Sequence, residues 1–254
     1  FFDLDNTMMV GASMFYFARG LASRRFLTAR DIVVFSWRQI RFRASGRESP
    51  EHMMQAREAA LRFAAGRRVA ELALVSEEIY DELMAGRIWN GTRELAQAHL
   101  DAGERVWLVT AAPIELARVV AARLGLTGAL GTVAESTDGR YTGRLVGVPL
   151  HGPSKAAAVR RLAAAEGLDL ARCTAYTDSF NDLPMLQLVG TPVAVNPDPR
   201  LRAEAERAGW PIHDFRARRR AGQLAVRAVV VSGALAAAGA VTAIAYRVSW
   251  GRNR

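Results

Sequence analysis

Two carboxylates near the start of the chain are the side chains best suited to chemistry. Asp3 and Asp5 lie in the run FDLDNT at residues 2–7, directly after an apolar pair that is typical of a buried strand. Ligands bind at the carboxyl edge of an open α/β sheet, so both carboxylates can face one cavity there. One of them can then act as a nucleophile and the other as a general acid and base.

A second polar feature ends another apolar segment. Thr110 closes the run VWLVT and is followed by Ala111 and a predicted helix. A hydroxyl and backbone N–H groups at a strand-to-helix junction can hold a phosphate. Thr110 and Ala111 are therefore candidate phosphate-binding residues, with an ordinary turn as the alternative.

The third feature is a single lysine. Lys155 follows Gly-Pro-Ser at the start of a predicted helix. The chain contains thirty-three arginines but no other lysine. A lysine ammonium can pair with a nucleophilic carboxylate and a phosphate as a compact point charge, without the wide fork of an arginine. We therefore expect Lys155 to lie in the same site.

The fourth feature is the acidic loop YTDSFND at residues 176–182, which again follows a short strand. Asp178 and Asp182 would add carboxylates at the same sheet edge. Carboxylates, a carbonyl and several waters suit Mg²⁺, which prefers oxygen ligands in octahedral geometry. For Asp182 the alternative of an acidic loop that caps a helix stays open.

In this order, the motifs DLDNT, Thr110, Lys155 and DSFND resemble the haloacid dehalogenase-like hydrolases. The resemblance covers about residues 1–215. The helical insert between the first two motifs is similar to that of the subclass that contains phosphoserine phosphatase. The resemblance implies that Asp3 forms an aspartyl-phosphate, while Asp5 protonates the leaving oxygen and then activates water.

The resemblance also assigns the remaining roles. It implies that Mg²⁺ is bound by Asp3, Asp178 and the Leu4 carbonyl, with the Asp5 carbonyl as an alternative ligand. The phosphoryl group would be bound by Thr110, Ala111 and Lys155, and the site completed by Asn181 and Asp182.

Strands that alternate with helices must position these motifs, which predicts an α/β fold with a Rossmann-like, three-layer parallel sheet. We expect strands near 1–4, 105–110, 173–177 and 192–195, helices near 92–101, 114–124, 154–166 and 199–209, and a hairpin over 132–147. The catalytic core would comprise residues 1–12 and 91–215. Residues 13–90 would form a helical cap, with helix starts at Thr28 and Ser49.

The tail, residues 216–254, reads as a basic linker plus a transmembrane helix. Residues 228–246 carry no charge, and nineteen helical residues span roughly 28 Å, about one hydrocarbon core. The larger arginine cluster precedes this span, which predicts a cytoplasmic catalytic domain at the inner face of the membrane. An alanine-rich helix packed on protein is the alternative. We also expect residues before Phe1, because the chain begins inside an apparent strand.

The start of the predicted cap argues against phosphoserine, a substrate in the family that the sequence resembles. Phosphoserine phosphatases carry a glutamate shortly after their first motif for the substrate amine, whereas residues 10–18 contain no acid. An unpaired ammonium would lose solvation there. We therefore expect a lipid-linked or other anionic phosphomonoester, because the arginines and aromatics of residues 13–68 suit an anionic headgroup. Phosphoserine is the alternative.

Composition excludes several other classes. The formal charge is +9, but no nucleic-acid-binding module is visible, so no nucleic acid is expected as a partner. The one cysteine, Cys173, excludes an intramolecular disulfide and fits a reducing compartment. The four histidines show no metal-binding spacing. A non-catalytic membrane adaptor would require a broken motif, and all four are intact; a phosphotransferase remains open.

Overall fold

The apolar start of the chain lies in the middle of a parallel sheet. A computed structural model describes residues 1–24, 26, 61 and 64–216. Phe2 pairs in parallel with Leu108 on one side and with Tyr176 on the other. The order across the sheet is β2 (Gly128–Thr132), β1 (Trp107–Pro113), the segment at Phe2, β5 (Thr174–Thr177), β6 (Thr191–Val195) and β7 (Ile212–His213).

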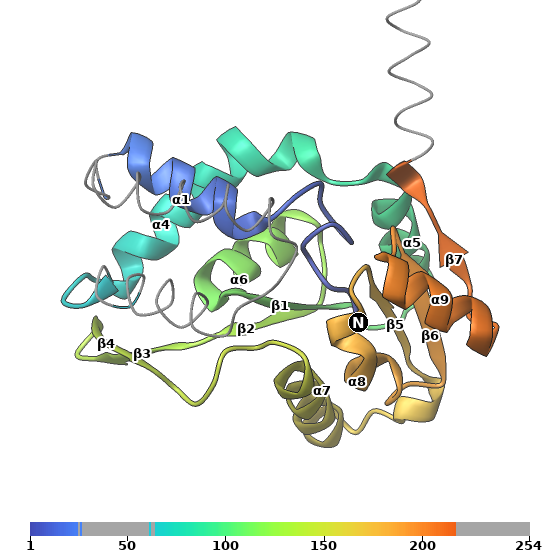
Figure 1. The fold of residues 1–254 in the computed structure, drawn as a ribbon. Helices are drawn as coiled ribbons and strands as arrows, with labels where there is room; N and C mark the ends of the chain where they lie inside the picture. Colours follow the sequence, from blue (N-terminus) through green and yellow to red (C-terminus); the bar gives the residue numbers. More distant parts are fainter. Residues whose placement is uncertain (25, 27–60, 62–63, 217–254) are drawn as a thin grey trace, which may run out of the picture. The chain divides into compact units, whose positions relative to one another are not determined.

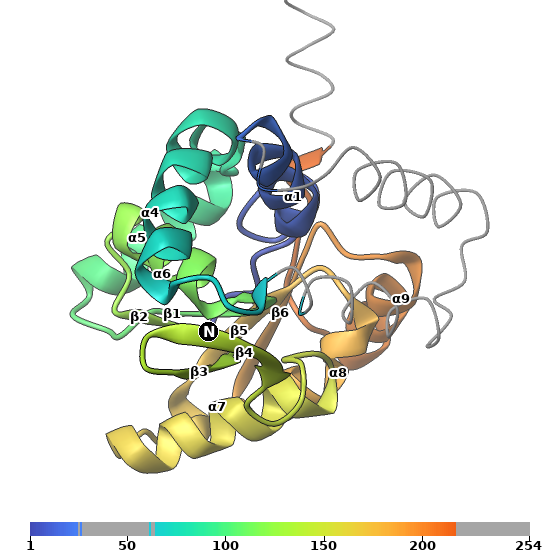
Figure 2. The same cartoon turned by 90° about the vertical axis from the view of Figure 1, so that its left-hand side faces the viewer.

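Helices cover both faces of this sheet because side chains alternate along each strand. Phe1, Val109 and Ala175 belong to the core that includes α7 (Pro153–Glu166), α8 (Leu183–Leu186) and α9 (Pro199–Ala208). The Phe2 ring faces the other way and contacts His99 of α5 (Asn90–Asp101). Figures 1 and 2 show α6 (Ile114–Arg123) and α7 on opposite sides of β1 and β2. The predicted three-layer α/β fold is confirmed.

Turn and cap residues set the predicted boundaries. The Asp198 carboxylate accepts hydrogen bonds from two N–H groups in the first turn of α9, and Gly209 ends that helix with φ of 69°. Asp138 and Gly139 both have positive φ between β3 (Ala134–Thr137) and β4 (Arg140–Leu145). This is the backbone that a two-residue hairpin turn requires, so the predicted hairpin is confirmed.

The described part of the cap contains two helices that approach closely. α1 (Ser13–Ser23) and α4 (Val69–Ile79) meet at Gly20, where an added Cβ would lie 2.4 Å from a side-chain carbon of Ile79. Arg24 then bonds to Glu78 and Glu82 at 2.8 and 2.7 Å. A π-helical turn (Tyr80–Met84) and a 3₁₀ turn (Ala85–Arg87) follow α4. The predicted helix starts at Thr28 and Ser49 lie outside the described residues.

Backbone hydrogen bonds join the cap to the core at two places. The Val10 N–H donates to the Arg87 carbonyl at 2.8 Å, so the two connections between core and cap run side by side. The Gly66 N–H donates to the Tyr141 carbonyl of β4, also at 2.8 Å. The β3–β4 hairpin therefore supports the segment that leads into α4 (Figure 1).

The sequence patterns did not predict β2, and its glycines explain why. Glycine weakens the pattern by which strands are recognised. Gly128 packs against the ring of Trp107, where an added Cβ would lie 2.5 Å from a ring carbon. A Cβ added at Gly131 would lie 2.8 Å from the Cα atom of Ile114. Here glycine permits close packing on β1 and α6.

The chain divides into one unit at Phe1–His213 and a second at Asp214–Arg254. The predicted transmembrane span, residues 228–246, lies outside the described residues. In the part of the chain that the structure describes, no helix has both the length and the apolar character needed to cross a membrane.

Candidate active site

Asp3 lies at the carboxyl edge of the sheet, held by its own backbone and by two side chains. Its N–H donates to the Tyr176 carbonyl at 2.9 Å, which continues the pairing of Phe2. One carboxylate oxygen bonds to the Lys155 ammonium at 2.5 Å, and the other accepts from the Thr7 hydroxyl at 3.1 Å. Asp3 is only 5% exposed. Its carboxylate is therefore held in one orientation.

Lys155 reaches this edge from the first turn of α7. Its ammonium bonds to Asp182 at 2.7 Å as well as to Asp3, and its side chain is 5% exposed. The loop before it needs a glycine, because Gly152 has φ of 52° and an added Cβ would lie 3.3 Å from the Asn181 carbonyl oxygen. The only lysine of the chain thus joins two motifs that are far apart in sequence.

The acidic loop contributes one paired carboxylate and one that is nearer to solvent. The Asp182 oxygen that bonds to Lys155 also accepts from the Thr177 hydroxyl at 2.8 Å. Asp178 is half-buried, and its backbone carbonyl accepts from the Asp198 N–H at 2.7 Å. Asn181 lies in the same loop, with its carbonyl oxygen against Gly152.

Asp5 is bound by the first residue of α1 rather than by the sheet. Its carboxylate accepts a 2.7 Å hydrogen bond from the backbone N–H of Ser13, the first residue of α1. Asn6, which follows Asp5, has φ of 57°, so the chain turns away from the strand here. Asp5 is half-buried.

Thr110 and Ala111 lie within β1, at the register shift between Val109 and Pro113, and not at the strand-to-helix junction that the sequence predicted. The Thr110 hydroxyl accepts from the Ala112 N–H at 3.1 Å, so it supports this irregular part of the strand. Thr110 is 1% exposed. The Ala111 carbonyl accepts from the Thr132 hydroxyl at 2.7 Å. Because Phe2 pairs with Leu108, this irregular part of β1 follows directly after the pairing that precedes Asp3.

Electrostatics at this edge favour a bound cation. Burial raises the pKa of Asp3 to about 7, with Lys155 opposing the rise, and burial together with the charge on Asp3 raises the pKa of Asp178 to about 8. Burial alone would lower the pKa of Lys155, but Asp3 and Asp182 raise it above its ordinary value. One ammonium, that of Lys155, lies near four carboxyl groups, those of Asp3, Asp5, Asp178 and Asp182. Acidic groups are therefore in excess at this edge.

The donor set fits Mg²⁺ if carbonyl and water ligands supplement the carboxylates. Among the described residues, no group of three or more His, Cys, Asp and Glu side chains is placed to hold a metal ion. The Leu4 carbonyl accepts hydrogen bonds from the Met8 and Met9 N–H groups at 3.0 Å, so it is directed into its own loop. That favours the Asp5 carbonyl, the alternative from the sequence, over Leu4.

Two functional candidates did not emerge from the sequence. Thr177, which is fully buried, bonds to Asp182, and Ser13 bonds to Asp5. A polar residue at the end of an apolar strand was a usable signal for Thr177. No sequence signal marks Ser13, because its contact arises from a backbone N–H group that any residue except proline supplies.

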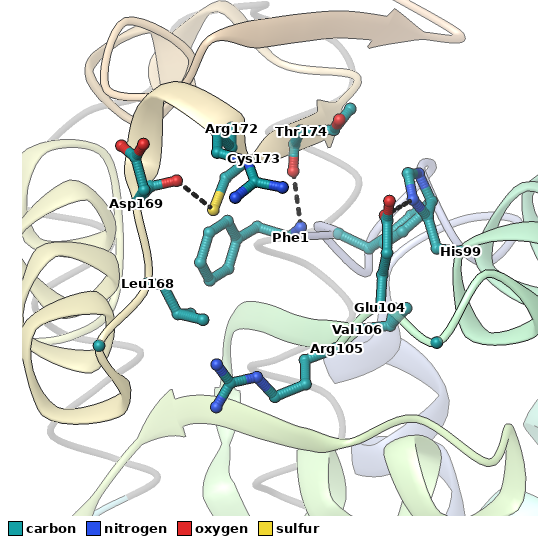
Figure 3. Close-up of a pocket in the computed structure, with 13 residues that line it drawn as sticks. Phe1, His99, Glu104, Arg105, Val106, Leu168, Asp169, Arg172, Cys173 and Thr174 are labelled. Atoms are coloured by element: carbon teal, nitrogen blue, oxygen red, sulfur yellow. Dashed lines mark hydrogen bonds and ion pairs between the residues drawn. The ribbon is translucent and has the colours of Figure 1, made fainter.

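A cavity of about 340 Å³ lies at the opposite, amino end of the same strands. Figure 3 shows His99 and Glu104 on one side of it and Asp169 and Cys173 on the other. His99 bonds to Glu104 at 2.5 Å, and the Cys173 thiol donates to the Asp169 carbonyl at 3.3 Å. None of the predicted catalytic residues lines this cavity.

Comparisons with known proteins agree with the motifs. The model of the haloacid dehalogenase-like hydrolases matches residues 1–187. Phosphoserine phosphatase SerB1 of Mycobacterium tuberculosis is 57% identical over 247 residues, which cover 97% of this chain and 80% of that protein. A crystal structure from Bordetella pertussis, of a protein with unknown function, has a TM-score of 0.73 and 30% identity and covers 84% of this chain and 96% of its own.

A substrate-bound phosphoserine phosphatase complex shares the fold, with a TM-score of 0.56 and 19% identity over 85% of this chain and 93% of that one. With three quarters of its length matched by the family model, and with the motif residues gathered at one sheet edge, the chain belongs to the haloacid dehalogenase-like hydrolases.

Proposed function

We propose that the chain is a Mg²⁺-dependent phosphomonoesterase that transfers the phosphoryl group to Asp3. The observation that carries this proposal is the buried ammonium of Lys155, which bonds to both Asp3 and Asp182. A point charge in that position can neutralise a phosphoryl group as it approaches Asp3. Membership in the hydrolase family and the phosphatase relatives make the chain a phosphatase.

The proposed reaction has two steps. The Asp3 carboxylate attacks phosphorus, while Asp5 gives its proton to the leaving oxygen, and an aspartyl-phosphate results. Asp5 then takes a proton from the water that attacks the aspartyl-phosphate, which releases phosphate and restores Asp3. Thr110 and the N–H of Ala111, in the irregular last part of β1, would bind phosphoryl oxygens together with Lys155.

Mg²⁺ would be held by Asp3, Asp178 and the Asp5 carbonyl, where it would neutralise charge on the phosphoryl group. The excess of carboxyl groups and their raised pKa values support this assignment. The ion would also keep the Asp3 carboxylate ionised at neutral pH, as a nucleophile requires.

We favour phosphoserine as the substrate over the lipid-linked phosphate that the sequence led us to expect. The support is the 57% identical relative that is named a phosphoserine phosphatase. A phosphomonoester without an amine is the second candidate, because the first turn of α1 contains no acidic residue.

A substrate panel tests this assignment. Phosphoserine, glycerol phosphate, lysophosphatidate and p-nitrophenyl phosphate would be assayed with Mg²⁺ and with a chelator, and the Asp3→Asn variant would serve as the control. Phosphoserine should give the highest kcat/KM, with activity lost on chelation and in Asp3→Asn. Preference for lysophosphatidate would restore the lipid candidate, and activity in Asp3→Asn would overturn the mechanism.

The proposed membrane attachment rests on the uncharged run at residues 228–246 and its flanking arginines. It would place the phosphatase at the inner face of the cell membrane. Fractionation of cells that express the full chain tests it. Recovery of the chain in the membrane fraction, and its release when residues 217–254 are deleted, is the expected result; recovery of the full chain in the soluble fraction would exclude the anchor.

A further inference from the structure

The turn that follows β6 contacts two of the loops that form the candidate active site. It begins at Asn196 and ends at Asp198, in the run NPDP, and it lies at the carboxyl end of its strand as the motif loops do. Asn196 is fully buried, and its N–H donates to the His213 carbonyl of β7 at 2.7 Å. This turn belongs to none of the four motifs, so their roles leave its contacts unexplained.

The backbone of this turn is restricted at every residue. Pro197 and Pro199 have a fixed φ, and Pro199 also confines Asp198 to extended backbone, which has φ of −64° and ψ of 164°. Asn196 has φ of 48°, in the left-handed region that asparagine enters more readily than most residues. Because the turn is restricted and is bonded to β7, it can hold neighbouring loops at fixed positions.

The side chain of Asn196 holds the loop that carries Asp5. Its amide donates to the Asn6 carbonyl at 2.9 Å. The Asn6 N–H donates to the Gly11 carbonyl at 3.3 Å. The peptide group between Asp5 and Asn6 is planar and trans, so the Asp5 carbonyl points opposite to that N–H. The direction of the Asp5 carbonyl, which is a proposed Mg²⁺ ligand, is therefore set by contacts at Asn6.

Asp198 holds the loop that carries Asp178. Its N–H donates to the Asp178 carbonyl at 2.7 Å, and its Oδ2 atom accepts from the Phe180 N–H at 2.8 Å. The guanidinium of Arg200 lies over the Phe180 ring, 4.2 Å from its centroid. The Oδ1 atom of Asp198 has a different task, because it accepts the N–H groups of Arg200 and Leu201 at the start of α9. One carboxylate oxygen thus caps the helix and the other binds the loop.

We propose that Asn196 and Asp198 are positioning residues that keep the Asp5 carbonyl and the Asp178 carboxylate at the separation that Mg²⁺ requires. This inference rests on the metal site of the proposed function. Mg²⁺ demands near-ideal octahedral geometry, so ligands on two separate loops need a common support. Residues that orient metal ligands typically contribute about 10- to 100-fold to metal affinity. Loss of either contact should therefore weaken Mg²⁺ binding, although neither side chain is a proposed ligand.

Each contact can be removed while the surrounding backbone is kept. Asn196→Gly removes the amide, and glycine adopts positive φ freely. Asp198→Ser keeps one side-chain oxygen, which can cap α9, but leaves no acceptor for the Phe180 N–H. Arg200→Ala removes the contact with the Phe180 ring from an exposed position. Arg207→Ala removes an exposed arginine from the other end of α9 and is the matched control.

The readout is the Kd for Mg²⁺, measured by titration calorimetry on the metal-free full chain, together with the Tm of each variant without metal. Asn196→Gly and Asp198→Ser should each raise the Kd by about 10-fold, Arg200→Ala by about 2- to 3-fold, and Arg207→Ala by less than about 1.5-fold. Release of either loop already frees the ligands to separate. The double variant should therefore raise the Kd by less than about 30-fold, whereas independent effects would multiply to about 100-fold.

A lowered Tm with an unchanged Kd for Mg²⁺ in Asn196→Gly and Asp198→Ser would show a purely structural role and overturn the proposal. A raised Kd in Asp198→Ser alone would trace the effect to the lost charge, with the same consequence. If the variants of the buried turn do not fold, the exposed pair provides the test, and equal Kd values in Arg200→Ala and Arg207→Ala would overturn the proposal.

Asp178→Asn separates this inference from the proposed function. Mg²⁺ binding that is lost in Asp178→Asn but unchanged in Asn196→Gly and Asp198→Ser would overturn this inference alone. A wild-type chain that binds no Mg²⁺ would overturn the proposed metal site and this inference with it.

Discussion

The two ends of the central strands present different kinds of polar site. At the carboxyl end, Asp3 and Asp182 are 5% and 3% exposed and share the ammonium of Lys155. At the amino end, the pair of Arg105 and Glu166 has side chains that are 44% and 38% exposed. The amino end has a cavity of about 340 Å³, and the carboxyl end has buried carboxyl groups in excess of the one ammonium.

None of the motif residues lines the amino-end cavity, so the candidate site is identified by desolvated charge and not by hollow space. Tyr176 and Thr177 are neighbours on β5, yet the first bonds to His99 at the amino-end cavity and the second to Asp182 in the candidate active site. Burial without a counter-ion raises the pKa of a carboxyl group, and such groups gather where ligands bind. The candidate site follows from charge and hydrogen bonding.

The largest expected effect comes from removal of the shared ammonium. Lys155→Met leaves Asp3 and Asp182 buried without a counter-ion, so unfolding free energy should fall by about 3–5 kcal/mol and kcat by about 100- to 1000-fold. At the other end, Arg105→Ala breaks an exposed pair and should change stability by less than about 1 kcal/mol. Urea unfolding and steady-state kinetics measure both. Equal destabilisation by the two variants would contradict the proposed difference between the buried charges at the carboxyl end and the exposed ion pair at the amino end.

Metal removal should make the stability contributed by the carboxyl-end site depend on pH. Asp3 and Asp178 have folded pKa values of about 7 and 8, above the ordinary value of 3.8, so the folded protein binds these protons more tightly than the unfolded chain does. Without metal, this contribution to stability is complete below about pH 4 and is lost as the pH rises to about 8. Mg²⁺ competes with the same protons, so the rise in Tm on adding Mg²⁺ should grow from about pH 5 to pH 8.

Differential scanning calorimetry with a chelator and with excess Mg²⁺ measures this dependence. Arg105→Ala is the control, because it leaves the carboxyl-end site unchanged. It should show the same growth of the Mg²⁺-induced rise in Tm with pH as the wild type. A Mg²⁺-induced rise in Tm that is the same at pH 5 and pH 8 would contradict a metal site built from Asp3 and Asp178.

The two neighbours on β5 provide the smallest and most closely matched comparison. Thr177→Val removes one of the two hydrogen bonds to the Asp182 oxygen that pairs with Lys155. Because a hydrogen bond to a charged group contributes about 1.5–3 kcal/mol, we expect kcat to fall by about 10-fold. Tyr176→Phe removes the bond to His99 but keeps the stack on Phe2, whose ring lies 4.1 Å away, so kcat should change by less than about 2-fold. Kinetics at saturating Mg²⁺ test the pair, and a larger loss in Tyr176→Phe would reverse the assignment.

Sequence reasoning reached the architecture because local signals and burial agree along most of the chain. The apolar strands at β1 and β5, the helix ends at Gly167 and Gly209, and the turn at Asp138 all lie where the patterns placed them. The sequence patterns missed β2 because it contains glycines, which have low strand propensity; one of them, Gly128, packs closely on Trp107. Sequence reasoning also placed residues 1–4 as a strand without indicating that they occupy the centre of the sheet.

The candidate site was predictable where chemistry depends on side-chain type and was not where it depends on the backbone. The solitary Lys155 indicated its own importance through composition. The direction of the Leu4 carbonyl and of the Ser13 N–H depends on backbone hydrogen bonds after the first strand, which residue types alone do not specify. The substrate is a further case, because the acid absent from the start of α1 led us toward a lipid phosphate, whereas one 57% identical relative is named a phosphoserine phosphatase.

The central claim is that Asp3 receives the phosphoryl group, and a trapping experiment tests it most directly. Asp5→Asn should accept a phosphoryl group from p-nitrophenyl phosphate, whose leaving group needs no proton, but it should release phosphate slowly because water is not activated. Acid quenching followed by peptide mass spectrometry should then find about one phosphoryl group per chain, on Asp3, and none in the double variant with Asp3→Asn. A phosphoryl group on another residue, or an undiminished one in the double variant, would contradict the account.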